Sequence, residues 1–254
     1  SGIIGAGYGR VTNVTPMAKA IRVIEELIER GQLAGQPPLA VYQRVANIID
    51  RESEFRSKHG AADYEEFWIN DVVTELQNSG VASPTFDAGD VIRVYEILTR
   101  ERISTRKVGW KVRAGVGYVF QTFDGDSDSD PALELGAEYH YPLSNQTQFS
   151  DEALMTTLID SDSSYNFRNV MSLTHEIDDR IDWENAWTLS HAYEATADVR
   201  NTVNTISSTF IYELRNQLDL TTTLAFSNYS GSESLADPNG TDTSLFVGVR
   251  YRLR

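Results

Sequence analysis

Hydrophobic residues recur with two different periods along this chain, and the change between them falls near Thr105. From Thr15 to about Arg100 the apolar positions have the spacing of one face of an amphipathic helix. The first such segment begins with Thr15 as an N-cap and Pro16 at the first helical position. The pattern predicts a helical bundle within residues 15–104, with helices over 15–35, 39–60, 63–80 and 87–102.

After Thr105 apolar and polar residues alternate, which is the period of a β-strand. Between Val108 and Phe120 the apolar side chains fall on one face, and glycines, Lys111 and Arg113 fall on the other. The same alternation predicts strands over residues 108–120, 132–141, 147–158, 164–175, 180–194, 203–214, 217–228 and 243–253.

The links between these predicted strands are alternately short and long. Short links lie near residues 143–146, 177–180 and 214–217 and share one sequence scheme, so the repeating unit is a two-strand hairpin. The long links are rich in Asp, Ser, Asn and Gly. Outer-membrane barrels have short periplasmic turns and longer external loops. The expected fold class is therefore α+β multidomain: the helical bundle, then an antiparallel up-and-down transmembrane β-barrel of about eight strands over residues 105–254.

Composition narrows the classes of function. The formal net charge of −15 argues against nucleic acid as a partner, because phosphate binding needs a basic patch. The chain has no cysteine, which excludes disulfides and thiolate metal sites. It also has no apolar run of about 18 residues, so no transmembrane helix is expected. The start of the sequence lacks the basic and apolar regions of a signal peptide.

Aromatic residues separate a membrane sheet from a soluble β-sandwich, which alternates in the same way. Six of them lie toward segment ends on the apolar face, where the aromatic girdles of a membrane barrel are found. These residues are Trp110, Tyr118, Tyr139, Tyr141, Trp183 and Tyr193. Segments of about 11 residues are long enough for tilted strands to cross a bilayer.

Four segments resemble the salt-induced outer membrane protein family, which are small Gram-negative outer-membrane β-barrels. They are RAGVGYVF, LELGAEYHYPLSNQTQF, NFRNVMSLTHEIDDRIDW and FVGVRYRL. The resemblance covers roughly residues 106–254 and implies an outer-membrane location, with the helical domain in the periplasm. It also implies contact with outer-membrane lipid, lipopolysaccharide and the barrel-assembly machinery. It carries no catalytic residues, and the chain is not expected to be an enzyme.

The end of the chain resembles the C-terminal signal that the barrel-assembly machinery reads. Gly248, Tyr251 and Leu253 stand at the spacing of that signal. The chain departs from it by ending in Arg254, where such signals end in an aromatic residue.

Charged residues on the polar face predict a network inside the barrel. Its members are Lys111, Arg113, Glu134, Glu138, Glu184, Arg250 and Arg252. If the first and last predicted strands meet, Lys111 and Arg113 neighbour Arg250 and Arg252. Such charges persist only where they are paired or hydrated. They would form a salt-bridged plug in a monomer, or line a wide channel if several chains pooled their strands.

The acidic segment after the first predicted strand is a candidate calcium loop. Asp124, Asp126, Asp128 and Asp130 stand at alternate positions, and such carboxylates can converge on a hard cation. The bidentate Glu of an EF-hand is missing, so a solvated acidic outer loop is the alternative. No other metal or cofactor site is predicted, because the histidines lack metal-ligand spacing.

The glycine-rich residues 1–14 lack the GxGxxG spacing of a nucleotide loop and are expected to be a flexible leader or a segment that passes through the lumen. For the whole chain three functions stay open. The first is an outer-membrane anchor or assembly component with a periplasmic helical domain. The second is one protomer of an oligomeric export pore, with a homo-oligomer or a periplasmic protein as partner. The third is a soluble periplasmic binding protein whose β part is a sandwich.

Overall fold

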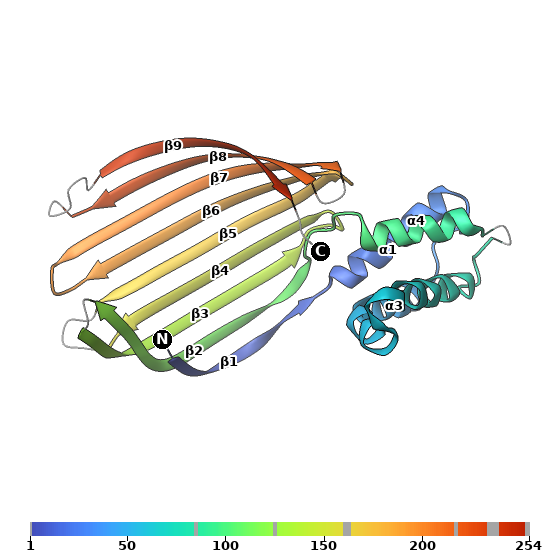
Figure 1. The fold of residues 1–254 in the computed structure, drawn as a ribbon. Coiled ribbons are helices and arrows are strands. Elements are labelled where there is room, and N and C mark those ends of the chain that lie inside the picture. The colour runs from blue at the N-terminus through green and yellow to red at the C-terminus, as the bar shows by residue number, and fades with distance from the viewer. Residues whose placement is uncertain are drawn as a thin grey trace. The chain divides into compact units, whose positions relative to one another are not determined.

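The computed structural model describes residues 2–83, 86–123, 126–159, 164–215, 218–232 and 239–251, without the side chains of residues 2 and 119–130. The chain divides into two compact units. The sheet unit combines Ser1–Thr12 with Lys107–Arg254, and the helical unit is Asn13–Arg106. The helical unit is thus inserted between the first two strands of the sheet (Figure 1).

Four helices form the helical unit in the described residues, as the sequence predicts. They are α1 (Thr15–Glu29), α2 (Leu39–Asp50), α3 (Glu52–Gln77) and α4 (Ala88–Thr99). Gly60 was predicted to end the second helix, but it lies within α3, where its φ of 82° interrupts the helical backbone. Only glycine adopts such a φ without strain, so the chain bends there and helix resumes. None of the described helices is both long and apolar enough to cross a bilayer.

The core of the helical unit is formed by the apolar stripes of its helices. Trp68 is the largest fully buried side chain, and its indole N–H donates to the Ile48 carbonyl over 3.0 Å. The two ends of the unit meet, because the Val14 amide donates to the Arg106 carbonyl over 2.8 Å. The Arg106 amide in turn donates to the Thr15 hydroxyl over 2.9 Å. The first and last residues of the helical unit therefore lie next to each other.

The sheet unit is one sheet in which every strand pairs with its neighbours in the chain, in the order β1 to β9. The strands are β1 (Gly2–Asn13), β2 (Lys107–Phe123), β3 (Asp126–Pro142), β4 (Thr147–Leu158), β5 (Tyr165–Asp178), β6 (Ile181–Glu194), β7 (Val199–Arg215), β8 (Leu218–Gly231) and β9 (Asn239–Tyr251). The predicted antiparallel meander after four helices is confirmed. A sandwich of two packed sheets is not what the described strands form.

The glycine-rich start of the chain is a strand, whereas the sequence predicted a leader over residues 1–14. Gly5 lies against Ala114 and Gly9 against Trp110, so β1 runs antiparallel to β2. A Cβ atom on Gly9 or Gly109 would collide with the backbone of the facing strand, and both residues have a positive φ. These glycines therefore let β1 approach β2 closely, which is a use of glycine within strands.

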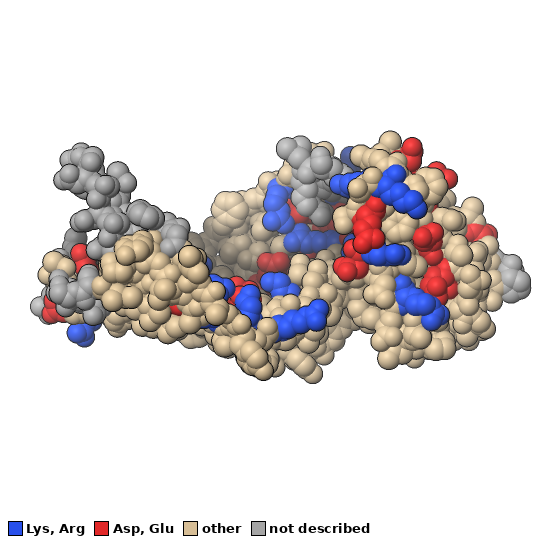
Figure 2. Space-filling view, turned by 90° about the horizontal axis from the view of Figure 1, so that it is seen from below, with Lys and Arg blue, Asp and Glu red and all other residues tan. Residues whose placement is uncertain are grey.

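The register assigns each side chain to one of two faces. Trp110 lies opposite Tyr139, and Lys111 lies opposite Glu138. We call the side of Trp110 the outer face and the side of Lys111 the inner face. The outer face of β2–β9 carries these exposed large hydrophobic side chains: Trp110, Val112, Val116, Tyr118, Leu135, Tyr139, Tyr141, Leu173, Trp183, Ile206, Phe210, Tyr212, Leu224, Phe226, Leu245, Val247, Val249 and Tyr251. Figure 2 shows basic side chains beside acidic ones where the surface is hollowed.

The described strands form one curved sheet, and its closure into the barrel that the sequence predicted stays a prediction. The order begins at β1 and ends at β9, and no pairing joins these two strands in the described residues (Figure 1). Because each strand is antiparallel to the next and there are nine in the described chain, β1 and β9 run in the same direction. The two end strands of the sheet, β1 and β9, therefore have the same orientation.

Replacing Gly109 tests the close approach of β1 to β2. We expect Gly109→Ala to lower the free energy of unfolding by about 1–3 kcal/mol, because alanine is strained at this positive φ and its methyl group meets the Arg10 carbonyl. Urea unfolding of the purified protein measures the change. Gly240→Ala is the control, since a Cβ atom there meets nothing within 4 Å. Equal effects of the two variants would contradict the proposed packing.

Candidate functional site

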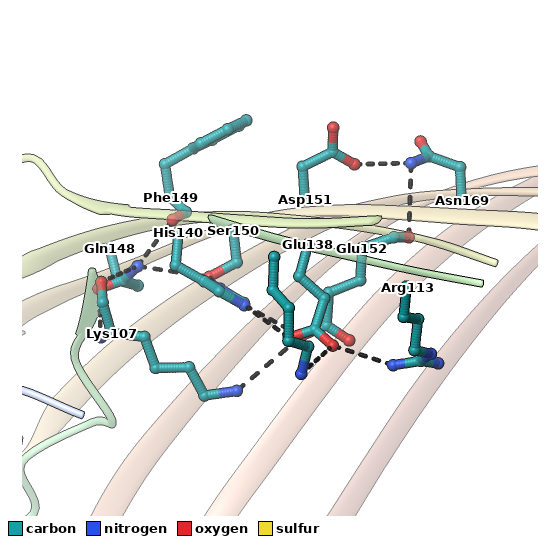
Figure 3. A network of polar contacts seen from close by, with 11 residues as sticks. Lys107, Arg113, Glu138, His140, Gln148, Phe149, Ser150, Asp151, Glu152 and Asn169 are labelled. Atoms are coloured by element: carbon teal, nitrogen blue, oxygen red, sulfur yellow. Dashed lines mark hydrogen bonds and ion pairs between the residues drawn. The ribbon is translucent and has the colours of Figure 1, made fainter. Parts of the chain in front are cut away.

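Charged side chains gather on the inner face of β2, β3 and β4, close to where the short turns begin. Figure 3 shows them pointing toward the remaining strands of the curved sheet, whereas Phe149 and Asp151 point away from those strands. Alternation explains this separation, because successive side chains in a strand point to opposite faces. We call the group Lys107, Lys111, Arg113, Glu134, Glu138, His140 and Glu152 the inner charge network.

Glu138 is the centre of the inner charge network. Its Oε1 atom lies 3.0 Å from Lys111 Nζ and 3.1 Å from Arg113 Nη1. Arg113 also reaches Glu134, with Nε 3.3 Å from Oε1. One guanidinium therefore joins two carboxylates that stand four residues apart on β3, which holds β2 and β3 together by side chains as well as by backbone.

Gly136 makes room for this arginine. It lies between Glu134 and Glu138 on the inner face, directly opposite Arg113 in the register. A Cβ atom on Gly136 would come within 2.8 Å of Arg113 Nε. The guanidinium therefore lies over the glycine, and any larger residue would displace it.

His140 extends the network to β4. Its ring is buried, and Nδ1 lies 2.9 Å from the Ser150 hydroxyl. Its Nε2 lies 3.7 Å from a carboxylate oxygen of Glu138 and 3.7 Å from one of Glu152. Glu152 in turn lies 4.0 Å from Lys107 Nζ. The imidazole is thus placed between two carboxylates.

Gln148 fixes the beginning of β2 against β4. Its side-chain amide donates to the Lys107 carbonyl over 3.1 Å, and its carbonyl oxygen accepts from the Lys107 amide over 3.1 Å. These two hydrogen bonds resemble those between the backbones of paired strands. They lie where the chain returns from the helical unit to the sheet.

The inner charge network is balanced, because three carboxylates face Lys107, Lys111 and Arg113. Its side chains are partly exposed: Arg113 keeps 43% and Glu138 19% of its side-chain surface. Paired charges of this kind neutralise one another and leave a hydrated polar surface. The arrangement suits a polar lining or a structural lock between strands. Among the described residues no group of acidic or histidine side chains is arranged to hold a metal ion.

Two predicted members of the network lie elsewhere. Glu184 is on the inner face of β6, and β5 separates it from Glu152. Arg250 pairs with Asp219 of the neighbouring strand β8, at 3.3 Å, and not with the charges of β2. The reason is that β1 occupies the edge of β2 where the last strand was expected. Arg252 lies outside the described residues.

The other predicted sites also differ from the structure or lie partly outside it. Asp126, Asp128 and Asp130 belong to β3 and pair with β2 in a regular register, so they are not in a loop. Their side chains are outside the described part, so the calcium site stays a prediction. Asp124 lies outside the described residues. Gly248 and Tyr251 are in β9, and Leu253 is beyond the described part, so the assembly signal stays a prediction.

Sequence reasoning missed four buried carboxylates at the short-turn end of the inner face. Glu176 faces Asp182 across β5 and β6, and Glu213 faces Asp219 across β7 and β8. All four are at least nine-tenths buried. The repeated hairpin scheme could have revealed them, because each pair flanks a short turn at equivalent positions.

The helical unit has a cavity of about 410 Å³ lined in part by Lys19, Glu52 and Arg56. Lys19 Nζ donates to the Leu98 carbonyl over 3.1 Å. Burial lowers the pKa of Lys19, and the charge of Glu52 opposes that shift. Arg56 donates to the Tyr64 hydroxyl over 2.7 Å. The basic groups of this cavity are thus engaged by the protein itself.

Comparison with known proteins gives one result for the sheet unit. Residues 100–214 match the family described as a protein of unknown function, DUF481. The match runs from the end of α4 through β2 to the end of β7. It therefore covers less than half of the chain and leaves out β1, most of the helical unit, β8 and β9. No curated protein and no solved structure matches the chain.

Removing the charge of Glu138 tests the centre of the network. We expect Glu138→Gln to lower the free energy of unfolding by about 1–2 kcal/mol, because Lys111 and Arg113 lose their shared acceptor charge. Glu152→Gln is the matched control, since Glu152 is 55% exposed and its ion pair is long. Urea unfolding compares the two. A larger effect at Glu152 would contradict the central position of Glu138.

Proposed function

We propose that the sheet unit spans the outer membrane with its outer face toward lipid, and that the chain is an outer-membrane anchor carrying a periplasmic helical domain. The exposed hydrophobic outer face carries the proposal. Soluble monomers rarely expose contiguous apolar patches of more than a few hundred Å². Here exposed aromatic and aliphatic side chains recur on the outer face of every strand from β2 to β9 except β4, whereas Tyr229 and Phe246 are exposed on the inner face.

Strand length supports the same proposal. The strands β2–β9 have 12 to 17 residues. At about 3.3 Å per residue even the shortest extends about 40 Å, which exceeds the roughly 30 Å hydrocarbon core of a bilayer. The match to DUF481 and the antiparallel meander fit a protein of the β-barrel kind.

One polar pair on the outer face fits this environment because its members satisfy each other. The Asn169 side-chain amide donates to the Asp151 carboxylate over 2.6 Å. A polar group at membrane depth is retained where it finds such a partner.

The connections suggest the orientation. The chain leaves β1 and enters β2 at the end of the sheet that carries the short turns. Short turns face the periplasm in outer-membrane barrels. The helical unit, which lies between β1 and β2 in the chain, is then periplasmic.

A pair of neighbouring cysteine variants tests the membrane proposal, since the chain has no cysteine of its own. Ile206 is on the outer face and 61% exposed, and Ser207 follows it on the inner face. Each cysteine variant, labelled with a fluorophore, is reconstituted into vesicles containing brominated phospholipid. We expect several-fold stronger quenching for Ile206→Cys than for Ser207→Cys. Equal quenching, or extraction of the protein without detergent, would contradict the proposal.

The open edges favour a second candidate function, a protomer of an oligomeric pore. Unpaired backbone groups at a sheet edge are not tolerated in the hydrocarbon region. Arg113 and Glu138 on the inner face are also partly exposed, whereas a small closed barrel fills its interior. Pairing β9 of one copy with β1 of the next would cover both edges and enclose a charged, hydrated lumen.

Cysteine cross-linking separates the pore from a chain that closes on itself. Tyr8 of β1 and Val249 of β9 are both exposed, at 75% and 62%. Tyr8→Cys combined with Val249→Cys, oxidised in membranes, should give species of two or more chains on a non-reducing gel. Further pairs with Val247 or Tyr251 cover the neighbouring registers. A faster-migrating single chain, without larger species, would rule out the pore and leave a self-closed anchor.

A further inference from the structure

A hollow of about 260 Å³ lies on the inner face beside the inner charge network, because Thr156 in its lining is opposite Glu134 in the register. Four neighbouring strands, β4 to β7, supply its walls. The polar residues of its lining are Thr156, Asn166, Arg168, Ser190, His191 and Asn201, of which His191 belongs to the outer face by the register. Leu154, directly opposite Arg168 in the register, forms part of its apolar wall.

Arg168 differs from the other described basic residues of the inner face. Lys107, Lys111, Arg113 and Arg250 each have a carboxylate within 4.0 Å. No carboxylate lies at ion-pair distance from Arg168 among the described residues. The nearest acidic position on the same face of β4 is Glu152, which faces Lys107 and His140 instead. In the part of the chain that the structure describes, Arg168 therefore keeps a positive charge without an ion-pair partner.

Four uncharged polar side chains in the lining also lack a partner within the described protein, as Arg168 does. In the described residues, the side chains of Thr156, Asn166, Ser190 and Asn201 make no hydrogen bond to the protein. Elsewhere on the inner face comparable groups pair with each other, as Thr209 does with Thr223 over 3.0 Å. Asn166, Arg168 and Asn201 are exposed, so these groups are open to solvent and can all be reached by a ligand in the hollow.

We propose that this hollow binds a small oxyanion, a phosphoryl or carboxylate group, with Arg168 as its main ligand. A guanidinium presents parallel N–H donors that match two oxygens of such a group. Asn166 and Asn201 supply further N–H donors, and Thr156 and Ser190 supply hydroxyls from the neighbouring strands. A cation is disfavoured by the charge of Arg168, and an uncharged ligand would leave that charge unused. The proposed anion site does not require that the outer face contacts lipid.

Calorimetric titration of the full chain in a non-ionic detergent tests the proposal, with inorganic phosphate and acetate as separate probes at constant ionic strength. We expect saturable binding with one site per chain. Arg168→Gln should raise the dissociation constant by about tenfold or more, and Arg168→Lys by a smaller factor because it loses the two-donor geometry. Asn201→Ala should weaken binding by a few fold while keeping the charge.

Arg200→Gln is the matched control. Arg200 is next to Asn201 in β7 but on the outer face, where its guanidinium lies over the Tyr193 ring, so this variant makes the same charge change outside the hollow. Its dissociation constant should equal that of the parent chain. Urea unfolding verifies that each variant is folded. Absence of saturable binding, equal weakening by Arg200→Gln, or equal affinity for chloride would overturn the proposal. Displacement of phosphate by acetate at the same site would support it and show that both oxyanion classes are accepted.

Discussion

Backbone hydrogen bonding between neighbouring strands fixes the register of this sheet, and the properties of both faces depend on that register. A slip of one residue in any pair would turn the side chains of that strand to the opposite face. Lys111 would then join the hydrophobic side and Trp110 the charged side. The glycines of β1 and β2, the reciprocal bonds of Gln148 and the Arg113 bridge to Glu134 and Glu138 all oppose such a slip.

Alternation in the sequence predicted β2–β9 and their faces well, because a period of two is a local property of each strand. The helices followed from their apolar stripes for the same reason. β1 was missed because glycine at positions 5, 7 and 9 carries no hydrophobic alternation and reads as flexible chain. Its pairing with β2 depends on a contact between segments far apart in the sequence. The misplaced partner of Arg250 follows from that one omission.

The inner face has two regions with different chemistry. Around Glu138 the charges are mutually compensated, and their effect is to hold β2, β3 and β4 together. Around Arg168 the polar groups have no such compensation within the described chain. The sequence could not separate the two regions, since Arg113 and Arg168 both alternate with apolar neighbours. What distinguishes them is the identity of residues on the adjacent strands, which only the register brings together.

The contact between Val14 and Arg106 also bears on the order in which the chain folds. β1 is synthesised long before β2, and pairing across the intervening residues would normally be slow because a long loop must close first. The helical unit has its own core, so it can fold early, and its folding brings Val14 and Arg106 to within one hydrogen bond. Once the helical unit has folded, the end of β1 and the start of β2 are as close as the ends of two strands joined by a short turn. The folded unit then has the role of that turn.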